Sequence, residues 1–332
     1  MKYYLFKISI FVFSIHLLNA QDPHFSQYFM SPLTINPALA GTGYGKFRLM
    51  SNFRSQWQIG GTPYSTYTLG LDANLLSNKK TKKNILGGGV LFLGDQSNFG
   101  LLKSSYVGLT IDYHQAIGKN SRIGGGFQAT LGKRYLDKLN LSFGNQFGKN
   151  GFDLSSSSGE NNLINMPLFY ALNAGVVYSY KSTFTQFDFG FSLYNLNKPN
   201  QSFLNDKSQI YPVETVFHAN YDVSLVNNIF FSGNAIFRIQ SKQNYFAVGG
   251  VLGFDMTKGN NNQILYLGNW FREGDAIYPY LGLLLNNIQL GISYDITISK
   301  QNLGSVSPQS IELSFVWRDL TRQFGKIRCP WK

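Results

Sequence analysis

Long stretches in which apolar and polar residues alternate constrain this chain more than any other feature. Between Ile288 and Ser299 every second residue is apolar, and every intervening residue is polar or glycine. Successive side chains of a β-strand point to opposite faces, so this stretch predicts a strand with one apolar face and one polar face. The same alternation occurs in residues 66–75 and, with a break at Val316, in residues 311–318.

About fourteen such segments follow one another along the chain. Most are longer than the roughly five to six residues of an ordinary soluble strand, and they match the roughly 9–11 residues that a tilted strand needs to cross a bilayer. We predict strands near residues 45–58, 63–75, 84–95, 103–117, 121–134, 166–180, 184–195, 213–225, 228–240, 244–257, 262–272, 277–286, 287–299 and 308–318.

An even number of long strands predicts an all-β fold, a transmembrane antiparallel β-barrel over residues 45–318. The barrel must be closed, because an open edge would leave unpaired backbone groups in lipid. The long connections, about 135–165 and 196–212, then face the cell exterior, and the short turns and both termini face the periplasm. A large β-sandwich is the soluble alternative.

Charged residues are expected on the inward faces of these strands. Facing carboxylates and guanidinium groups could pair and close the lumen, or they could line a water-filled channel and set its selectivity. The inward positions are predicted to include Arg54, Asp72, Asp112, Arg134, Asp188, Asp222, Arg238, Asp255, Arg272, Asp295 and Glu312.

The N-terminal part of the chain suits neither a strand nor a helix. Residues 1–20 have the pattern of a signal peptide, with two lysines before a short apolar run. Residues 21–44 contain three prolines, which remove backbone donors, yet they are too rich in large apolar residues for a solvated linker. We predict that this irregular segment packs inside or under the barrel. Clustered glycines at residues 87–89, 124–126 and 249–250 would let another backbone approach the wall.

The remaining features exclude several classes of function. The formal charge of +12 is scattered, which indicates solvated turns beside a membrane and not nucleic-acid binding. Residues 319–332 form a basic tail that is expected to be periplasmic, and its Cys329 is the only cysteine, so no internal disulfide exists. The histidines are isolated, and no hydrolase elbow or phosphate loop occurs. We therefore expect no catalytic residues, metal or cofactor, and a protein that is not an enzyme.

Six short elements, from Asp22-Pro-His-Phe-Ser-Gln27 to the closing Cys329-Pro-Trp331, give the chain a family resemblance. The others are Asn36-Pro-Ala-Leu-Ala-Gly41, Phe53-Arg-Ser-Gln-Trp57, Leu267-Gly-Asn-Trp-Phe-Arg272 and Gly291-Ile-Ser-Tyr-Asp-Ile296. In this order they resemble the PorP/SprF family of type IX secretion proteins of Bacteroidota. The resemblance implies an outer-membrane barrel that assists type IX secretion, with the translocon, the periplasmic ring and motor, and a cargo protein as partners.

The expected function is therefore export or surface anchoring of a cargo protein, such as a large gliding-type adhesin, through its C-terminal sorting domain. A small-solute or fatty-acid-type channel is the alternative. Asp22 and Asn36 either cap turns or contact a partner, and apolar groups in the second long loop mark a further contact. The candidate partner-binding residues are Asp22, Phe25, Tyr28, Asn36, Phe203 and Tyr211.

Overall fold

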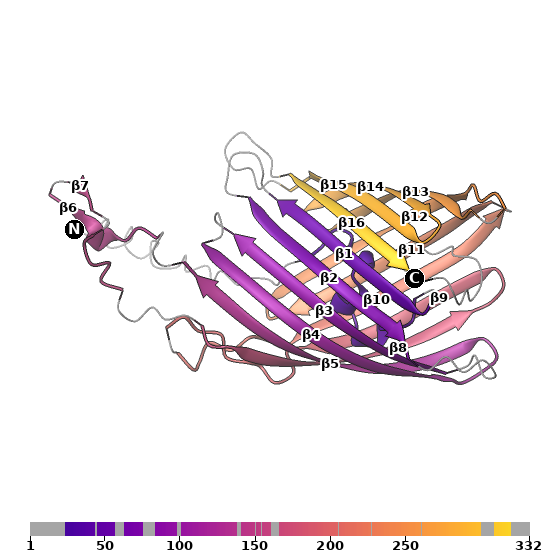
Figure 1. The fold of residues 1–332 in the computed structure, drawn as a ribbon, viewed down its shortest axis with the longest axis horizontal. Helices are drawn as coiled ribbons and strands as arrows, with labels where there is room; N and C mark the ends of the chain where they lie inside the picture. Colours follow the sequence, from indigo (N-terminus) through magenta and orange to yellow (C-terminus); the bar gives the residue numbers. More distant parts are fainter. Residues whose placement is uncertain are drawn as a thin grey trace, which may run out of the picture.

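The computed structural model describes residues 24–43, 45–56, 63–75, 84–97, 101–137, 141–149, 151–153, 155–160, 166–204, 206–226, 228–259, 261–299 and 309–319. Within these ranges fourteen strands form one closed antiparallel barrel (Figure 1). Closure is made by β1 (Phe47–Gln56), which pairs with β2 (Tyr64–Asn74) on one side and with β16 (Ser310–Arg318) on the other. No helix in the described ranges is long and apolar enough to cross a membrane.

The wall strands are long, as the alternation predicts. Each begins and ends within three residues of the predicted limits, and the prediction of a fourteen-stranded barrel is confirmed. The other wall strands are β3 (Ile85–Ser97), β4 (Leu102–Ala116), β5 (Ser121–Leu136), β8 (Phe169–Lys181), β9 (Thr185–Tyr194), β10 (Glu214–Val226), β11 (Ile229–Gln240), β12 (Gln243–Asp255), β13 (Gln263–Arg272), β14 (Ala276–Leu285) and β15 (Ile288–Thr297).

The two longest connections lie at the end of the barrel opposite the β14–β15 turn. The turn between β14 and β15 has two residues, and its Asn286 adopts a φ of +52°, the left-handed conformation that tight hairpin turns require. This turn shares the periplasmic end with the start of β1 and the end of β16 (Figure 1). The connections after β5 and β9, residues 137–168 and 195–213, are the long ones and lie at the extracellular end.

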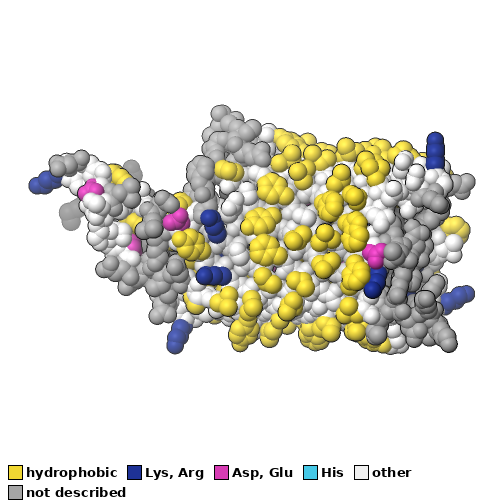
Figure 2. Space-filling model, in the orientation of Figure 1, with side chains coloured by type: hydrophobic (Ala, Val, Ile, Leu, Met, Phe, Trp, Pro, Cys, Tyr) yellow, Lys and Arg dark blue, Asp and Glu magenta, His cyan; other side chains and the backbone are white. Residues whose placement is uncertain are grey.

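The outer face of the wall is apolar. Leu69, Leu109, Phe127, Leu131 and Phe189 are all at least half exposed and point away from the lumen. Figure 2 shows such side chains covering the middle of the barrel, while lysines, arginines and carboxylates gather toward its ends. A broad apolar band with charged ends is the surface that an outer-membrane barrel presents to lipid.

The connection after β5 carries a small arm beyond the barrel. It contains η6 (Gly144–Gln146) and a hairpin of β6 (Phe147–Gly148) and β7 (Gly151–Phe152). In Figure 1 this hairpin lies well outside the extracellular end. The rings of Phe147 and Phe152 face each other with centroids 5.1 Å apart, and both remain largely exposed.

The N-terminal segment lies inside the barrel. It forms three single-turn 3₁₀ helices, η1 (Tyr28–Met30), η2 (Pro32–Thr34) and η3 (Pro37–Leu39), seen in indigo within the lumen in Figure 1. The prolines begin η2 and η3, where a missing N–H costs nothing. We call residues 24–43 the plug. The expectation of an irregular segment packed in the barrel is thus confirmed, and its prolines set its short helical turns.

Candidate functional site: the plug and the cavity beside it

The plug crosses the lumen from one end to the other. Its Gly41 donates its N–H to Asp72, near the periplasmic end of β2. Its Ser26 and Gln27 bond instead to Asp295 and Glu312, near the extracellular ends of β15 and β16. The plug therefore begins near the extracellular end of the barrel and ends near the periplasmic end.

Ionic and polar groups hold the extracellular end of the plug. The Glu312 carboxylate accepts the backbone N–H groups of Ser26, at 2.7 Å, and of Gln27, at 3.0 Å. The Ser26 hydroxyl donates to Asp295 at 2.8 Å. Asp295 also pairs with Arg54 at 2.8 Å and Arg272 at 2.5 Å, so one buried carboxylate joins two strands to the plug. Hydrogen bonds to charged groups of this kind are among the stronger ones in proteins.

Aromatic side chains pack the middle of the plug against β13 and β14. The Phe29 ring stacks on Trp270 with centroids 4.5 Å apart, and it meets Tyr280 edge-on at 5.6 Å. The indole N–H of Trp270 donates to Asn234 at 2.8 Å, and the Tyr28 hydroxyl donates to the same amide oxygen. All of these rings are buried, so this contact is well packed, and the Trp270 and Tyr28 donors share one acceptor oxygen.

Toward the periplasm the plug fits against glycines and histidines of the wall. Asn36 caps η3 by accepting the N–H of Ala38 at 2.9 Å, and its amide donates to the Val176 carbonyl at 3.0 Å. His114 lies 2.9 Å from the Ala38 carbonyl. A Cβ on Gly126 would lie 2.6 Å from the Ala38 nitrogen, so the predicted role of the glycine cluster in close backbone approach is confirmed there.

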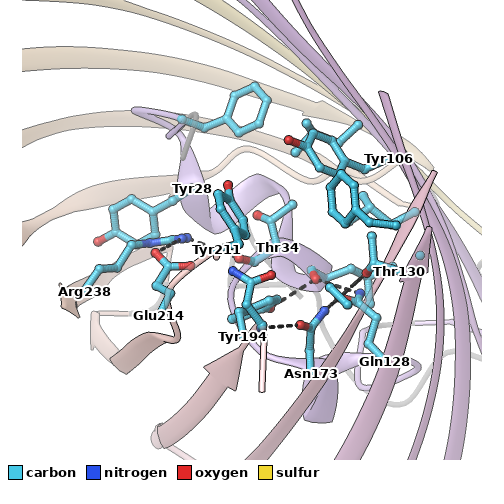
Figure 3. A pocket seen from close by; sticks show the side chains of 18 residues that line it. Tyr28, Thr34, Tyr106, Gln128, Thr130, Asn173, Tyr194, Tyr211, Glu214 and Arg238 are labelled. Carbon is cyan, nitrogen blue, oxygen red and sulfur yellow. Dashed lines mark hydrogen bonds and ion pairs between the residues drawn. The ribbon is translucent and has the colours of Figure 1, made fainter. Parts of the chain in front are cut away.

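A cavity remains beside the plug, on the side of β3, β4, β5 and β8. Its volume is about 110 Å³. Figure 3 shows Tyr28 and Thr34 of the plug on one side of it, with Tyr106, Gln128 and Asn173 of the wall opposite. The plug therefore fills the lumen unevenly.

The predicted site residues fall into three groups. Phe25, Tyr28 and Asn36 are buried in contact with the lumen wall, Asn36 in the capping role that the sequence allowed. Phe203 and Tyr211 lie in the extracellular connection after β9 and are partly buried. Asp22, the predicted signal peptide and the predicted tail from residue 320 lie outside the described residues. Binding of a partner by these residues stays a prediction.

The predicted inward charges lie on the lumen side, where Arg54 and Arg272 both pair with Asp295. Two others pair with charges that were not predicted. Arg238 binds Glu214 at 3.0 Å, and Arg48 binds Asp72, which stands opposite it in the β1–β2 register. Arg134 and Asp255 lie toward the barrel ends and are only partly buried. The pairing expected of these charges is present, but it joins strands that lie side by side or one apart in the wall, and it is the plug that fills the lumen.

Sequence reasoning missed Arg48, Glu214 and the Phe29–Trp270 stack. Arg48 and Glu214 have the inward parity of their strands, so a stricter count along each strand would have found them. Sequence reasoning also missed that the Arg272 guanidinium lies over Tyr278, 5.4 Å from the ring centroid.

Solved structures with a similar fold include two outer-membrane barrels. The Ralstonia pickettii toluene transporter TbuX has 10% identity and a TM-score of 0.50, covering 87% of this chain and 93% of its own. The Pseudomonas putida toluene transporter TodX has 9% identity and a TM-score of 0.52, covering 90% and 95%. Identities this low bear on the fold alone, and none of the curated proteins compared matches the chain.

The family comparison covers nearly the whole chain. Residues 17–317 match the family described as Type IX secretion system membrane protein PorP/SprF. This range includes the plug and all but the last residue of the barrel wall. With its closed barrel, apolar outer band and filled lumen, the chain is an outer-membrane β-barrel that belongs to the PorP/SprF family.

Proposed function

We propose that this protein is a non-enzymatic barrel that helps to export a cargo protein, or holds it at the cell surface, through the cargo's C-terminal sorting domain. The observation that carries this proposal is the filled lumen of a barrel whose family serves type IX secretion. Its buried ion pairs and stacked rings hold the plug in place, so the lumen is not arranged as an open passage. The translocon and its periplasmic ring and motor are the expected further partners.

The extracellular arm is the proposed contact for the cargo. Phe147 is 66% exposed and Phe152 is 41% exposed, and together they form an aromatic pair on a hairpin beyond the barrel. Exposed aromatic side chains are common anchors of protein interfaces, because they bury a large area on binding. The connection after β9, with Phe203 and Tyr211, adds a second candidate contact at the same end.

A pull-down from native outer membranes tests this proposal. The variant Phe147→Ser/Phe152→Ser should lose most of the co-purified secreted protein that carries a C-terminal sorting domain, while the barrel is still inserted at normal levels. Phe184→Ser is the matched control, since Phe184 is 70% exposed in the periplasmic turn between β8 and β9. Equal recovery of cargo with the double variant would contradict the assignment of the arm.

Conductance separates this function from the channel alternative. In a planar bilayer the intact protein should conduct few ions, because residues 24–43 fill the lumen, whereas a variant without residues 24–41 should conduct. High conductance of the intact barrel, together with a pull-down that recovers the barrel alone, would favour the channel.

A further inference from the structure

The cavity beside the plug offers mainly apolar surface to an occupant, because most of its buried polar groups bond to each other or to the plug backbone. The Gln128 amide donates to the Leu33 carbonyl at 3.2 Å, and Asn173 donates to the Gln128 oxygen at 2.8 Å. Arg238 and Glu214 form an ion pair (Figure 3). Much of the remaining lining is made of aromatic rings and aliphatic side chains, among them Phe25, Leu33, Leu91, Leu93, Tyr106 and Phe169.

The volume of the cavity limits what it can hold. A buried apolar cavity of about 150 Å³ stays dry and binds benzene. At about 110 Å³ and partly open, the cavity here has the size of one phenyl ring or a comparable branched group. Its walls are already formed, so an apolar group enters without first separating packed side chains.

The cavity is bordered at its extracellular side by groups from two strands and from the connection after β9. Arg134 of β5 donates to the Tyr106 hydroxyl at 3.2 Å and to the Tyr211 hydroxyl at 3.4 Å. Its guanidinium also lies 5.3 Å from the centre of the Tyr211 ring. Since Tyr106 and Tyr211 both line the cavity, an entering group passes beside a cation and two phenols.

One buried donor of the lining has no partner. Arg238 is largely buried, and its Nη atoms bond to Glu214 and to the Thr34 carbonyl. Its Nε makes no hydrogen bond within the described part of the chain. This Nε is shielded from the cavity as well as from solvent, so the donor that an occupant can reach is the Tyr211 hydroxyl, which accepts from Arg134 and keeps its own proton to donate.

We infer that this cavity is a binding site for one phenyl-sized apolar group that carries a neutral hydrogen-bond acceptor. The chemistry is shared by two sources, a free aromatic molecule such as a benzyl alcohol and an aromatic side chain of a polypeptide that reaches the extracellular end. The site does not depend on the cargo-binding role of the arm, which lies outside the barrel.

Fluorine NMR of two probes with the same ring tests this inference. The full-length protein in lipid nanodiscs is titrated with 4-fluorobenzyl alcohol and with N-acetyl-4-fluorophenylalanine amide. At least one probe should show saturable line broadening. Ala171→Phe, which places a ring inside the cavity, should weaken the binding tenfold or more. Leu172→Phe, at the neighbouring outward position, should leave it unchanged.

The two probes identify the source, and the variants decide the site. Binding of the alcohol alone assigns the cavity to free aromatic molecules, and binding of both probes makes it open to a polypeptide side chain. Leu91→Trp, which extends a larger ring into the cavity from β3, replaces Ala171→Phe if that variant does not insert. Absence of saturable binding to the unchanged protein, or equal binding to a filled variant that inserts normally, overturns the inference.

Discussion

The two sides of the lumen contact the plug in different ways. On the side of β13 to β16 the plug has stacked rings and a buried carboxylate between two guanidinium groups, and its backbone bonds to the wall. On the side of β3, β4, β5 and β8, in the extracellular half, it leaves a cavity of about 110 Å³. The side of β13 to β16, which we call the tight wall, therefore holds the plug, and the side of β3, β4, β5 and β8 leaves space for a ligand.

This difference indicates that a filled lumen need not be uniformly tight. A buried ion pair is a poor source of net stability, but removal of one partner is costly because it leaves a buried charge without a partner. Asp295 and Glu312 therefore fix the height and orientation of the plug. With the plug fixed on one wall, the opposite cavity keeps its shape.

The largest expected effect is at Asp295. Asp295→Asn removes the charge between Arg54 and Arg272, and we expect it to destabilise the folded barrel by about 3–5 kcal/mol. Urea unfolding from lipid vesicles measures this loss. Asp275→Asn is the matched control, because Asp275 also binds Arg272 but its side chain is 50% exposed. That pair should contribute about 1 kcal/mol or less. Equal losses for the two variants would show that the buried network does not hold the plug.

Substitution of two phenylalanines of the plug by alanine compares how tightly the two sides of the lumen pack. Phe29→Ala empties a site between Trp270 and Tyr280, and we expect a cost of about 3–5 kcal/mol. Phe25→Ala only enlarges a cavity that already exists, so fewer contacts are lost and the cost should fall below that range. The same urea measurement compares the two. A greater loss for Phe25→Ala would reverse the assignment of the tight wall.

Neighbouring glycines of β5 test the fit of the plug below the cavity. Gly126→Ala places a methyl group 2.6 Å from the Ala38 nitrogen, and overpacking of this kind costs about 1–3 kcal/mol. Gly125→Ala points away from the lumen, where the nearest atom to its Cβ would be 3.9 Å away, so it should be close to neutral. If Gly126→Ala is also neutral in urea unfolding, the backbone approach is not a constraint.

The wall of the barrel was predictable from the sequence because lipid and lumen impose a strict period of two. Once it is known which alternate residues of a strand face the lumen, the inward charges can be read from the sequence, as at Asp72 and Arg54. Which charges pair does not follow from parity alone, because it depends on the neighbouring strands and their register. Arg48 meets Asp72 only because β1 and β2 place them opposite each other.

The plug was predictable as a packed segment, but its site was not. Prolines and large apolar residues in 21–44 indicated burial, and Asn36 had the chemistry of a cap, which is the role it has. The cavity depends on how side chains from the plug and several separate wall strands fill a volume. No local pattern carries that information, so the lining of the cavity could only be found from the packed structure.

The smallest expected effect is a dependence of stability on pH through His24. Burial lowers the pKa of His24 well below its usual value, and Arg238, Arg54 and Arg272 lower it further. The unfolded chain, with a His pKa of about 6.5, then binds more protons than the folded one in acid. Stability from this group is thus fully present above about pH 6.5 and is lost as pH falls toward the folded pKa, by at most about 1.4 kcal/mol per pH unit.

His24→Gln should remove this part of the slope between pH 6.5 and pH 5 while it keeps a polar side chain beside Tyr245, whose ring lies 4.8 Å away. Urea unfolding of the two proteins at several pH values measures the difference. His24 lies beside the guanidinium groups of the tight wall, and its backbone carbonyl accepts from Arg54. If the free energy of unfolding changes with pH equally in His24→Gln and in the unchanged protein, His24 contacts water in the folded barrel. The close packing against the tight wall then does not extend to the first residues of the plug.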